Sequence, residues 1–418
     1  MKTIEGHDVK IFTDNIEDNA LEQIRTLVSI DVFSDKKIRI MPDVHSGAGC
    51  VIGFTGNLGD TVIPNIVGVD IGCGMKVLCL GKVRNIDFHA FHKHINSNIP
   101  SGMGIREEKR GFKPLIHEEM DIYREAKKLV MELRCYRDLK YSDRIYKAIG
   151  SLGGGNHFIE LDKDDEGNVY LVIHTGSRNL GKQVAEIYQS RAIKHMTPGA
   201  DEFEETVRRT IEEYKAAGKR SEIQSVLWHM RKNHHEAEPE LPKELCYLEG
   251  DGREDYLHDM RICQKWAILN RCLISSLLMK FFPETRVIGE FESVHNYISD
   301  DNIIRKGAVS AASGEKCIIP LNMRDGSLIC TGKGNVDWNC SAPHGAGRVL
   351  SRTQAYEKIT MEDFEKSMRG IYSESVNDFT RDESPMVYKP AEEIIVNIGE
   401  TVSIDAIIRP VFNFKASK

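Results

Sequence analysis

Residues 67 to 75 read V-G-V-D-I-G-C-G-M, a stretch in which Asp70 stands three residues ahead of Cys73. Glycine occupies positions 68, 72 and 74. Glycine removes side-chain bulk and frees the backbone for a tight turn. Such a turn lets a carboxylate and a thiol converge on one small object. We therefore predict that Asp70 and Cys73 bind a metal ion.

The length and composition around this stretch are typical of a globular protein. The chain has 418 residues, of which 41% are hydrophobic and 28% are charged, enough for a sizeable core. Polar residues interrupt the first thirteen positions, and no run approaches the roughly 20 apolar residues of a membrane helix. We expect a cytoplasmic protein without membrane association. Its ten irregularly spaced cysteines then indicate reduced thiols.

Two strands are predicted to deliver polar side chains at their ends. Residues 37–54 begin with alternating apolar side chains and continue into a glycine-rich loop, which predicts a strand that brings Asp43 and His45 to its end. Residues 169–178 repeat this design, with His174 at the end of the strand. Both strands therefore place polar side chains that can bind or react at the point where the strand ends and a loop begins.

Helical periodicity is clear over residues 123–133 and 256–278. Residues 201–244 are dense in Glu, Lys and Arg, and we interpret them as helices on the surface. This charged segment also contains three histidines, His229, His234 and His235. We favour a solvated face over a metal site there, because no glycine turn or strand end organises these imidazoles. No repeat or linker divides the chain, so we expect one domain over residues 1–418.

Four other histidines stand in short motifs: His157 in G-G-G-N-H-F, His174 in I-H-T-G-S-R, His295 in S-V-H-N-Y, and His344 in A-P-H-G-A-G-R. A single histidine is more often a core or surface residue than a ligand. Together with Asp70 and Cys73, however, these four suggest a metal centre. Arg178 and Arg348 each follow a histidine by four residues. Arginine and glycine-rich turns both bind phosphate, so the chain combines metal ligands with anion-binding loops.

The ligand types narrow the choice of metal and mechanism. Imidazole, thiolate and carboxylate together suit Mn, Fe, Co or Zn better than Mg or Ca. A bridging Cys73 thiolate would hold two ions about 3.5–4 Å apart, as in ion pairs that act on phosphoryl groups. Neither a P-loop pattern nor the glycine pattern of a dinucleotide-binding Rossmann fold occurs in its expected context. This argues against nucleotide binding by a P-loop or by a Rossmann fold.

Six motifs in order resemble those of the RtcB family of RNA ligases, and the match covers most of the chain. They are M-P-D-V-H at 41–45, V-G-V-D-I-G-C-G at 67–74, G-N-H-F-x-E at 155–160, H-x-G-S-R at 174–178, H-N at 295–296, and H-G-A-G-R at 344–348. The resemblance implies an α+β fold, a single large domain with mixed β-sheets and surrounding helices.

The resemblance also implies an activity. RtcB-like ligases use GTP and manganese to join an RNA end that carries a 2′,3′-cyclic phosphate or a 3′-phosphate to an end that carries a 5′-hydroxyl. Such a reaction serves RNA repair or tRNA splicing. The expected cofactors are therefore GTP and two Mn²⁺ ions, and the expected partner is RNA with those ends.

Site residues follow from the resemblance position by position. Cys73 would bridge the two ions; His174 and His295 would complete one ion site, and Asp70 and His157 the other.

The same correspondence identifies a nucleophile. His344 would attack the α-phosphate of GTP and carry GMP, and Asp43 would orient and charge-stabilise that imidazole. The residues expected to contact the nucleotide are Asn156, Glu160, Asn296, Pro320, Met323, Ser327, Gly345, Ala346, Gly347, Arg348, Tyr388 and Lys415.

The chain departs from the family pattern in one loop. The family typically has P-G-S-M-G where residues 320–327 read P-L-N-M-R-D-G-S. Replacing glycines by Leu and Arg removes positive-φ freedom and close backbone approach, so this loop must hold a nucleotide differently. Arg324 either contacts a phosphate or is a solvated loop residue. Ala416 also stands where a terminal glycine is common in the family.

The formal net charge of −7 argues against a general polyanion-binding protein, so RNA must meet a local basic patch. The candidates for such a patch are Arg178, Lys182, Lys306, Lys316, Lys333, Arg348 and Arg352.

Two other functions remain open from the sequence. A dinuclear phosphodiesterase or nuclease would use the same metals without a covalent intermediate, and so would not need His344. A non-catalytic RNA-end-binding protein would keep the metal and anion loops but not bind GTP.

Overall fold

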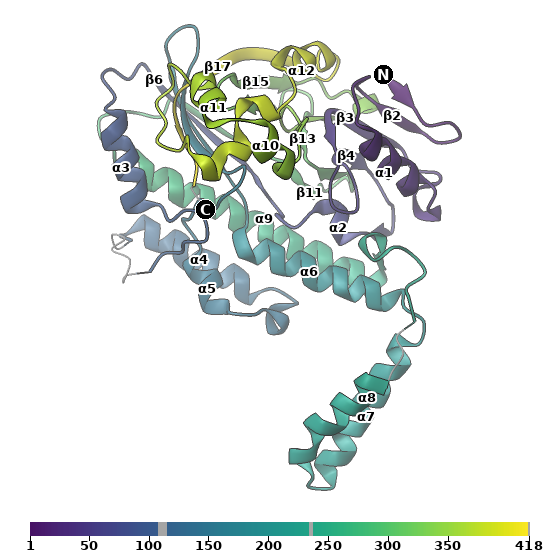
Figure 1. Ribbon diagram of the computed structural model, residues 1–418. Coiled ribbons are helices and arrows are strands. Elements are labelled where there is room, and N and C mark those ends of the chain that lie inside the picture. The colour runs from purple at the N-terminus through teal and green to yellow at the C-terminus, as the bar shows by residue number, and fades with distance from the viewer. Residues whose placement is uncertain (108–114, 234–236, 417–418) are drawn as a thin grey trace.

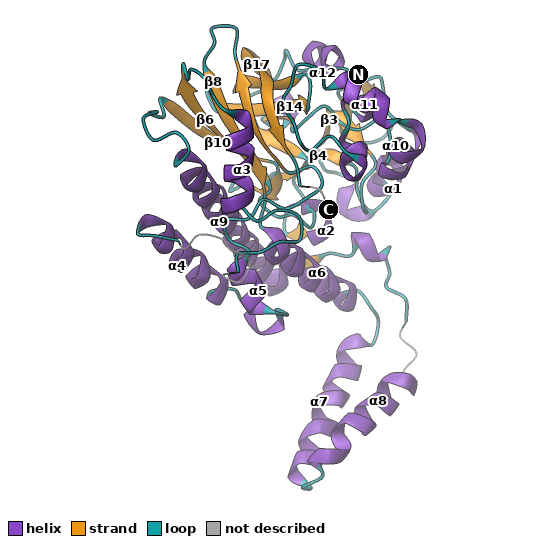
Figure 2. Ribbon diagram, turned by 60° about the vertical axis from the view of Figure 1, so that its left-hand side comes forward, coloured by secondary structure: helices purple, strands orange, loops and turns teal. Residues whose placement is uncertain are grey.

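A computed structural model describes residues 1–107, 115–233 and 237–416 of the chain. Strands of two larger sheets lie side by side, and helices cover them (Figures 1 and 2). The predicted mixture of β-sheets and surrounding helices is therefore confirmed. His234 and His235 lie outside the described residues.

The first larger sheet is mixed and contains the N-terminal strands. Its described strands, in spatial order, are β1 (Lys2–Thr3), β2 (Val9–Ile11), β3 (Ile38–His45), β4 (Ile52–Gly56), β12 (Ile304–Lys306) and β11 (Asn296–Ile298). β2 and β3 run parallel, and the other neighbours run antiparallel. Every residue of β3 before His45 is buried. β3 ends at His45, so this strand brings Asp43 and His45 to its C-terminal end as predicted.

The second larger sheet is antiparallel throughout its described pairs. Its strands, in spatial order, are β10 (Gly289–Val294), β6 (Gly74–Gly81), β8 (Val169–Thr175), β7 (Phe158–Lys163), β17 (Val402–Phe414), β15 (Gly326–Gly332) and β14 (Lys316–Asn322). The β-branched and aliphatic residues of β8 are buried, as expected for a central strand with both faces covered. Two short pairs complete the described strands: β5 (Thr61–Val62) with β9 (Leu248–Glu249), and β13 (Ala308–Ser310) with β16 (Ser341–Pro343).

A 30-residue helix, α9 (Gly250–Met279), runs beneath the second sheet and contains the helix predicted over residues 256–278 (Figure 1). It packs against β8 and beside its neighbouring helices. Trp266 of α9 is fully buried within the largest hydrophobic cluster. The other described helices are α1 (Asp18–Val28), α2 (Pro64–Val67), α3 (Phe88–Asn98), α4 (Glu118–Met131), α5 (Ser142–Lys147), α6 (Arg178–His195), α7 (Ala200–Ala216), α8 (Ile223–Asn233), α10 (Arg352–Lys358), α11 (Met361–Ser367) and α12 (Ala391–Asn397).

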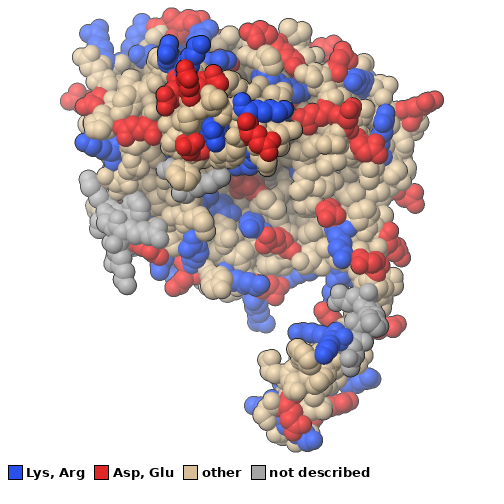
Figure 3. All heavy atoms as spheres, in the orientation of Figure 1, with Lys and Arg blue, Asp and Glu red and all other residues tan. Residues whose placement is uncertain are grey.

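The charged segment contains α7 and α8, which form a hairpin that projects from the rest of the molecule (Figures 1 and 2). His229 of α8 is exposed and stacks edge-on against Trp228, away from the other histidine motifs. None of the described helices is long and apolar enough to cross a membrane. All ten cysteines are unpaired in the structure. On the face drawn in Figure 3, acidic and basic side chains are interspersed.

Candidate active site

Four neighbouring strands of the second sheet bring candidate ligands to one edge. Cys73 directly precedes β6, His174 lies near the end of β8, His157 directly precedes β7, and His295 directly follows β10. Because these strands are antiparallel neighbours in the order β10, β6, β8, β7, the start of one meets the end of the next. Residues more than 200 positions apart therefore converge.

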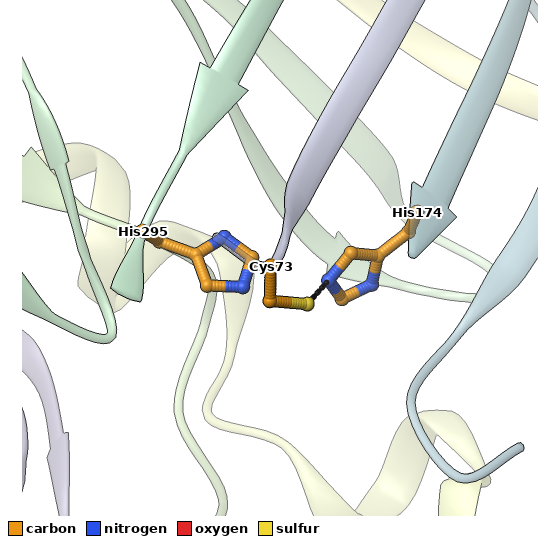
Figure 4. A group of neighbouring side chains, drawn as sticks. All are labelled: Cys73, His174 and His295. Atoms are coloured by element: carbon orange, nitrogen blue, oxygen red, sulfur yellow. Dashed lines mark hydrogen bonds between the residues drawn. The ribbon is translucent and has the colours of Figure 1, made fainter. Parts of the chain in front are cut away.

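The converging side chains form two groups that share Cys73. Cys73, His174 and His295 make one group, and Asp70, Cys73 and His157 make the other; within each, the potential ligand atoms lie within 4.8 Å of one another. His174 and His295 lie on either side of the thiol (Figure 4). The Cys73 Sγ atom is 3.4 Å from His174 Nε2 and 3.5 Å from His157 Nε2.

Backbone carbonyls orient two of these imidazoles. His157 Nδ1 donates to the Leu152 carbonyl at 2.9 Å, and His174 Nδ1 donates to the Asn156 carbonyl at 3.0 Å. Since a carbonyl only accepts, Nδ1 carries the proton in both rings. Each Nε2 therefore turns a lone pair toward Cys73, the arrangement that a metal ligand requires.

The electrostatics of the groups also fit a cation. Burial lowers the pKa of both His174 and His295 well below the ordinary value, which keeps the imidazoles neutral. Burial raises the pKa of Cys73 well above its usual range, and the Asp70 carboxylate raises it further. A thiolate there needs a positive ion to offset its charge. Asp70 Oδ1 and His295 Nδ1 are buried without a hydrogen-bond partner among the described residues, so each can offer a lone pair to a cation.

Gly176 shows how closely the second group is packed. A Cβ atom on this residue would lie 2.2 Å from Asp70 Oδ1. Only glycine fits between β8 and the carboxylate, which explains why the motif H-T-G-S-R has glycine at that position.

His344 lies beside the first group and is held by Asp43. The ring of His344 is 4.9 Å from that of His295, centroid to centroid. Asp43 Oδ2 accepts from His344 Nδ1 at 2.7 Å and from the His344 backbone N–H at 3.2 Å. Asp43 is fully buried, whereas 18% of the His344 side chain is exposed. Gly347, with φ +77°, allows the close approach, because a Cβ atom there would lie 2.2 Å from the Asp43 carbonyl oxygen.

His344 and His174 open into a pocket that most of the predicted nucleotide residues line. From that prediction, the lining includes Asn156, Glu160, Pro320, Met323, Gly345, Ala346, Gly347, Arg348, Tyr388 and Lys415. Asn296 and Ser327 do not line it. Asn296 donates to the Asp70 carbonyl at 3.2 Å and accepts from the Gly307 N–H at 3.0 Å, so it braces the loop that carries Asp70. Ser327 is buried in β15 opposite Pro320.

A buried carboxylate, Glu383, organises the cations of the pocket. Its oxygens accept from Lys415 Nζ at 3.1 Å, from the Tyr388 hydroxyl at 2.7 Å and from Arg348 Nη1 at 3.3 Å. Burial opposes ionisation of Glu383, but Lys415 and Arg348 together hold its pKa below the usual value. Glu383 was not predicted as a site residue, because the two cations that it holds lie 32 and 35 residues away along the chain.

Two further lining residues were not predicted as site residues. His45 lies in the quoted motif M-P-D-V-H, and its Nδ1 hydrogen-bonds the Asp43 carbonyl at 2.9 Å. Burial lowers the pKa of His45 to about 4, so this ring is neutral near pH 7. Phe158 lies next to His157 and packs beneath the Lys415 ammonium at 5.6 Å. Both residues lie at the end of a strand, next to or within a motif. That position was the feature of the sequence that could have identified them as site residues.

Comparisons with known proteins identify the family of this chain. The family model described as tRNA-splicing ligase RtcB matches residues 23–416. The chain belongs to the RtcB family. It is 29% identical to the RNA-splicing ligase RtcB of Escherichia coli strain K12, over 98% of this chain and 97% of that protein. It is 25% identical to the tRNA-splicing ligase RtcB of Aeropyrum pernix, over 88% and 85%, and 23% identical to that of Thermococcus kodakarensis, over 94% and 90%.

The loop in which this RtcB protein departs from the family pattern is a tight hairpin between β14 and β15. Asn322 Oδ1 accepts from the backbone N–H groups of Arg324 and Asp325, which closes the turn without the missing glycines. Arg324 forms an ion pair with Asp325 at 2.7 Å and does not line the pocket. Leu321 is buried in a hydrophobic cluster. The pocket wall at this loop is therefore made by Pro320, Leu321, Asn322 and Met323.

The seven basic residues that were candidates for an RNA-binding patch do not form one patch on the surface. Lys306 is buried and donates to the carbonyls of Ala48 and Asn65. Lys316 pairs with Asp405, and Lys333 bonds a backbone carbonyl. The remaining cations divide between two places: Arg348 and Arg352 line the pocket beside His344, whereas Arg178 and Lys182 line a second pocket beside Asp70.

Proposed function

We propose that this chain is a GTP-dependent RNA ligase that joins a 2′,3′-cyclic phosphate or 3′-phosphate RNA end to a 5′-hydroxyl end through a GMP–histidine intermediate. The observation that carries the proposal is the pair of His344 and Asp43 at 2.7 Å, placed between the metal-ligand groups and a pocket rich in cations. Membership of the RtcB family supports the same reaction class.

The first step uses the lone pair of His344 Nε2. Because Nδ1 donates its proton to Asp43, Nε2 is free to attack the α-phosphorus of GTP. A P–N bond forms, the bond from that phosphorus to the bridging oxygen breaks, and pyrophosphate leaves. The imidazole becomes positively charged as the P–N bond forms, and the buried Asp43 carboxylate stabilises that charge.

The next steps consume the intermediate. An oxygen of the RNA 3′-phosphate attacks the phosphorus on His344, the P–N bond breaks, and a diphosphate bridge between RNA and GMP forms. The 5′-hydroxyl of the second RNA end then attacks the RNA 3′-phosphate, a 3′,5′-phosphodiester forms, and GMP leaves. A cyclic phosphate must first be opened by water to the 3′-phosphate.

Pocket residues would bind and orient the nucleotide. Arg348 and Lys415 are donors near His344, held in place by Glu383, and suit the phosphates. Asn156 and Glu160 also line the pocket and offer polar groups to the rest of the nucleotide. Burial raises the pKa of Glu160 to about 7, so this carboxyl exchanges its proton near neutral pH.

The two ligand groups would hold divalent ions, with Cys73 shared between them. His174 and His295 would serve one ion, and Asp70 and His157 the other. Bound ions of this kind polarise phosphoryl oxygens and lower the pKa of water for the opening of a cyclic phosphate. We propose Mn²⁺ as that ion, from the family resemblance.

We also propose that residues 1–418 act as one catalytic domain. Site residues come from positions as far apart as Asp43 and Lys415, and both large sheets contribute. Limited proteolysis would contradict this organisation if it produced two stable halves.

The deciding experiment is to incubate the protein with α-labelled GTP and Mn²⁺ and to locate the label by peptide mass spectrometry. We expect GMP on the peptide that contains His344, and no label in the His344→Ala variant although its metal content is unchanged. Label on the same peptide of that variant would overturn the nucleophile. Bound GTP without transfer would favour a phosphodiesterase, and absence of nucleotide binding to the metal-loaded protein would favour an RNA-end-binding protein.

A further inference from the structure

Two adjacent residues of α9, Asn270 and Arg271, are fully buried although neither lines the pocket or belongs to a ligand group. An arginine that is completely removed from water is uncommon and needs partners for its donors. The partners of both residues are the segments that carry the candidate metal ligands.

Arg271 contacts three of these segments. Its Nη1 donates to the carbonyl of Gly72 at 3.0 Å and to the carbonyl of Thr175 at 2.8 Å. Gly72 directly precedes Cys73, and Thr175 directly follows His174. The same guanidinium pairs with Glu292 of β10 at 2.9 Å, three residues before His295. One buried side chain therefore ties together the strand ends that bear Cys73, His174 and His295.

Asn270 holds the segment before His157. Its Oδ1 accepts from the backbone N–H of Gly150 at 2.7 Å, and its Nδ2 donates to the Ser151 carbonyl at 3.1 Å. The next residue is Leu152, whose carbonyl accepts the Nδ1 proton of His157. Asn270 thus acts on the imidazole of His157 through the carbonyl that orients it.

Asn270 also joins the segment before His157 to the segment after His174, which Arg271 contacts. Its Nδ2 donates to the Gly176 carbonyl at 3.2 Å, two residues after His174. The Thr175 hydroxyl donates to the same Leu152 carbonyl at 2.6 Å. The two ligand groups share a thiol. The distance between the segments that carry His157 and His174 therefore decides whether each group can bind an ion at the same time.

We propose that Asn270 and Arg271 are positioning residues that fix the two metal-ligand groups relative to each other from beneath the sheet. This inference rests on the metal binding within the proposed function. Neither residue would touch an ion. The pair acts through four backbone carbonyls, the backbone N–H groups of Gly150 and Ser151, and Glu292, so that ligands from four strand ends keep one spacing.

Asp259, eleven residues before Asn270, provides a matched control within the same helix. It is also fully buried and accepts from the backbone N–H groups of Arg134 and Cys135 and from the Tyr188 hydroxyl. Two of these partners lie in the turn after α4 and the third lies in α6, and none precedes or follows a candidate ligand. A loss of packing alone should therefore affect Asp259→Asn as much as variants of the positioning pair.

The test measures the binding of Mn²⁺ alone to the full chain, by the electron paramagnetic resonance signal of free Mn²⁺, in Arg271→Lys, Asn270→Ala and Asp259→Asn. Lysine keeps the charge of Arg271 but cannot bridge three segments with a rigid fork. Groups that orient metal ligands typically change affinity by about 10–100-fold when removed. We expect that loss in both positioning variants and parental affinity in Asp259→Asn. Thermal unfolding of the metal-free proteins gives the stability loss of each variant.

A second readout follows the thiolate directly. Co²⁺ bound to the unaltered protein should show a sulfur-to-cobalt charge-transfer band from Cys73, and the band should shift or weaken in Arg271→Lys and Asn270→Ala. Should one of these two variants not fold, the other decides the question by the same measurements.

Unchanged Mn²⁺ affinity in the folded positioning variants would overturn the inference. So would affinity losses that simply follow the stability losses and include Asp259→Asn, because the role would then be structural only. Failure of the unaltered protein to bind Mn²⁺ would overturn both this inference and the proposed metal sites. GTP is absent from the experiment, so a failure of GMP transfer to His344 overturns the ligase alone and is distinguished from these results.

Discussion

The metal-ligand groups and the pocket beside them fix their polar side chains in different ways. In the ligand groups, backbone carbonyls hold the imidazoles: Leu152 orients His157, and Asn156 orients His174. In the pocket, a single carboxylate, Glu383, accepts from two cations of other segments, Arg348 and Lys415, and from the Tyr388 hydroxyl. The first arrangement follows from strand ends that meet at one sheet edge, whereas the second depends on long-range ion pairs. The ligand groups should therefore resist changes in charge that loosen the pocket.

The largest expected effect is at the residue that both ligand groups share. Cys73→Ala removes the common thiol, so we expect the loss of both bound ions from a chain that still folds. Metal analysis after loading with Mn²⁺ and gel filtration measures this. Cys246→Ala is the control, because Cys246 is another buried free thiol, and its sulfur hydrogen-bonds two carbonyls of its own loop and no candidate metal ligand among the described residues. Two ions per chain in Cys73→Ala would contradict the shared ligand.

Asp43→Asn should leave the ligand groups intact and disable His344. Asparagine can accept from the same two N–H groups of His344 through its amide oxygen, but it is neutral and no longer stabilises the positive charge that forms on the imidazole. The loss of one preorganised electrostatic contact of this kind typically costs about 10²–10³-fold in rate. Single-turnover transfer of GMP to the protein measures the effect, and an unchanged Mn²⁺ content shows that the two regions are separable. A rate within tenfold of the parent would contradict the role of Asp43.

Glu383→Gln tests how far the pocket depends on one charge. Removing a buried partner leaves Arg348 and Lys415 without their carboxylate, and such a loss costs about 3 kcal/mol of unfolding free energy. We also expect GTP to bind about tenfold more weakly, as the cations lose their positions. Chemical denaturation and nucleotide titration measure the two effects. Asp325→Asn is the control, since that surface ion pair contributes at most about 1 kcal/mol.

The sequence predicted the ligand groups better than the pocket for a physical reason. Each ligand residue sits within a few positions of a glycine or a strand end, so Asp70, Cys73 and His157 stand out locally. Glu383 has no such neighbours, and its importance comes from Lys415 and Arg348, which reach it from other parts of the chain. Local patterns reveal turns and strand ends, whereas the partners of a buried charge follow from the tertiary fold alone.

The same limit applies to the helix beneath the sheet. Periodicity predicted a helix over residues 256–278, and α9 covers it. Asn270 and Arg271 look like ordinary polar residues of a helix, yet both are fully buried. Lys306, predicted for a basic patch, is likewise buried and bonded to carbonyls. Burial of a polar residue depends on what packs above it, which periodicity does not specify.

Glu160→Gln addresses the pH dependence of the pocket. Burial raises the pKa of Glu160 to about 7 from an ordinary 4.5, so the folded protein keeps a proton that the unfolded chain releases above pH 4.5. The unfolding free energy therefore falls as pH rises from about 4.5 to about 7, with a slope of at most about 1.4 kcal/mol per pH unit from this group. We expect Glu160→Gln to reduce the slope in denaturation series between these pH values, while the neighbouring Asp162, whose pKa burial also raises, keeps its own part of the slope. Glu202→Gln, at an exposed site, should leave it unchanged.

The smallest expected effect is at the loop that departs from the family pattern. Arg324 was a candidate phosphate contact, but its guanidinium pairs with Asp325 and 47% of its side chain is exposed. Arg324→Ala should change the unfolding free energy by less than about 0.5 kcal/mol and GTP affinity by less than about twofold. Arg348→Ala, within the pocket, should weaken GTP binding at least tenfold in the same titration. Equal losses of GTP affinity in the two variants would mean that the hairpin moves and places Arg324 on the nucleotide. Arg324 would then belong to the pocket and not to a surface loop.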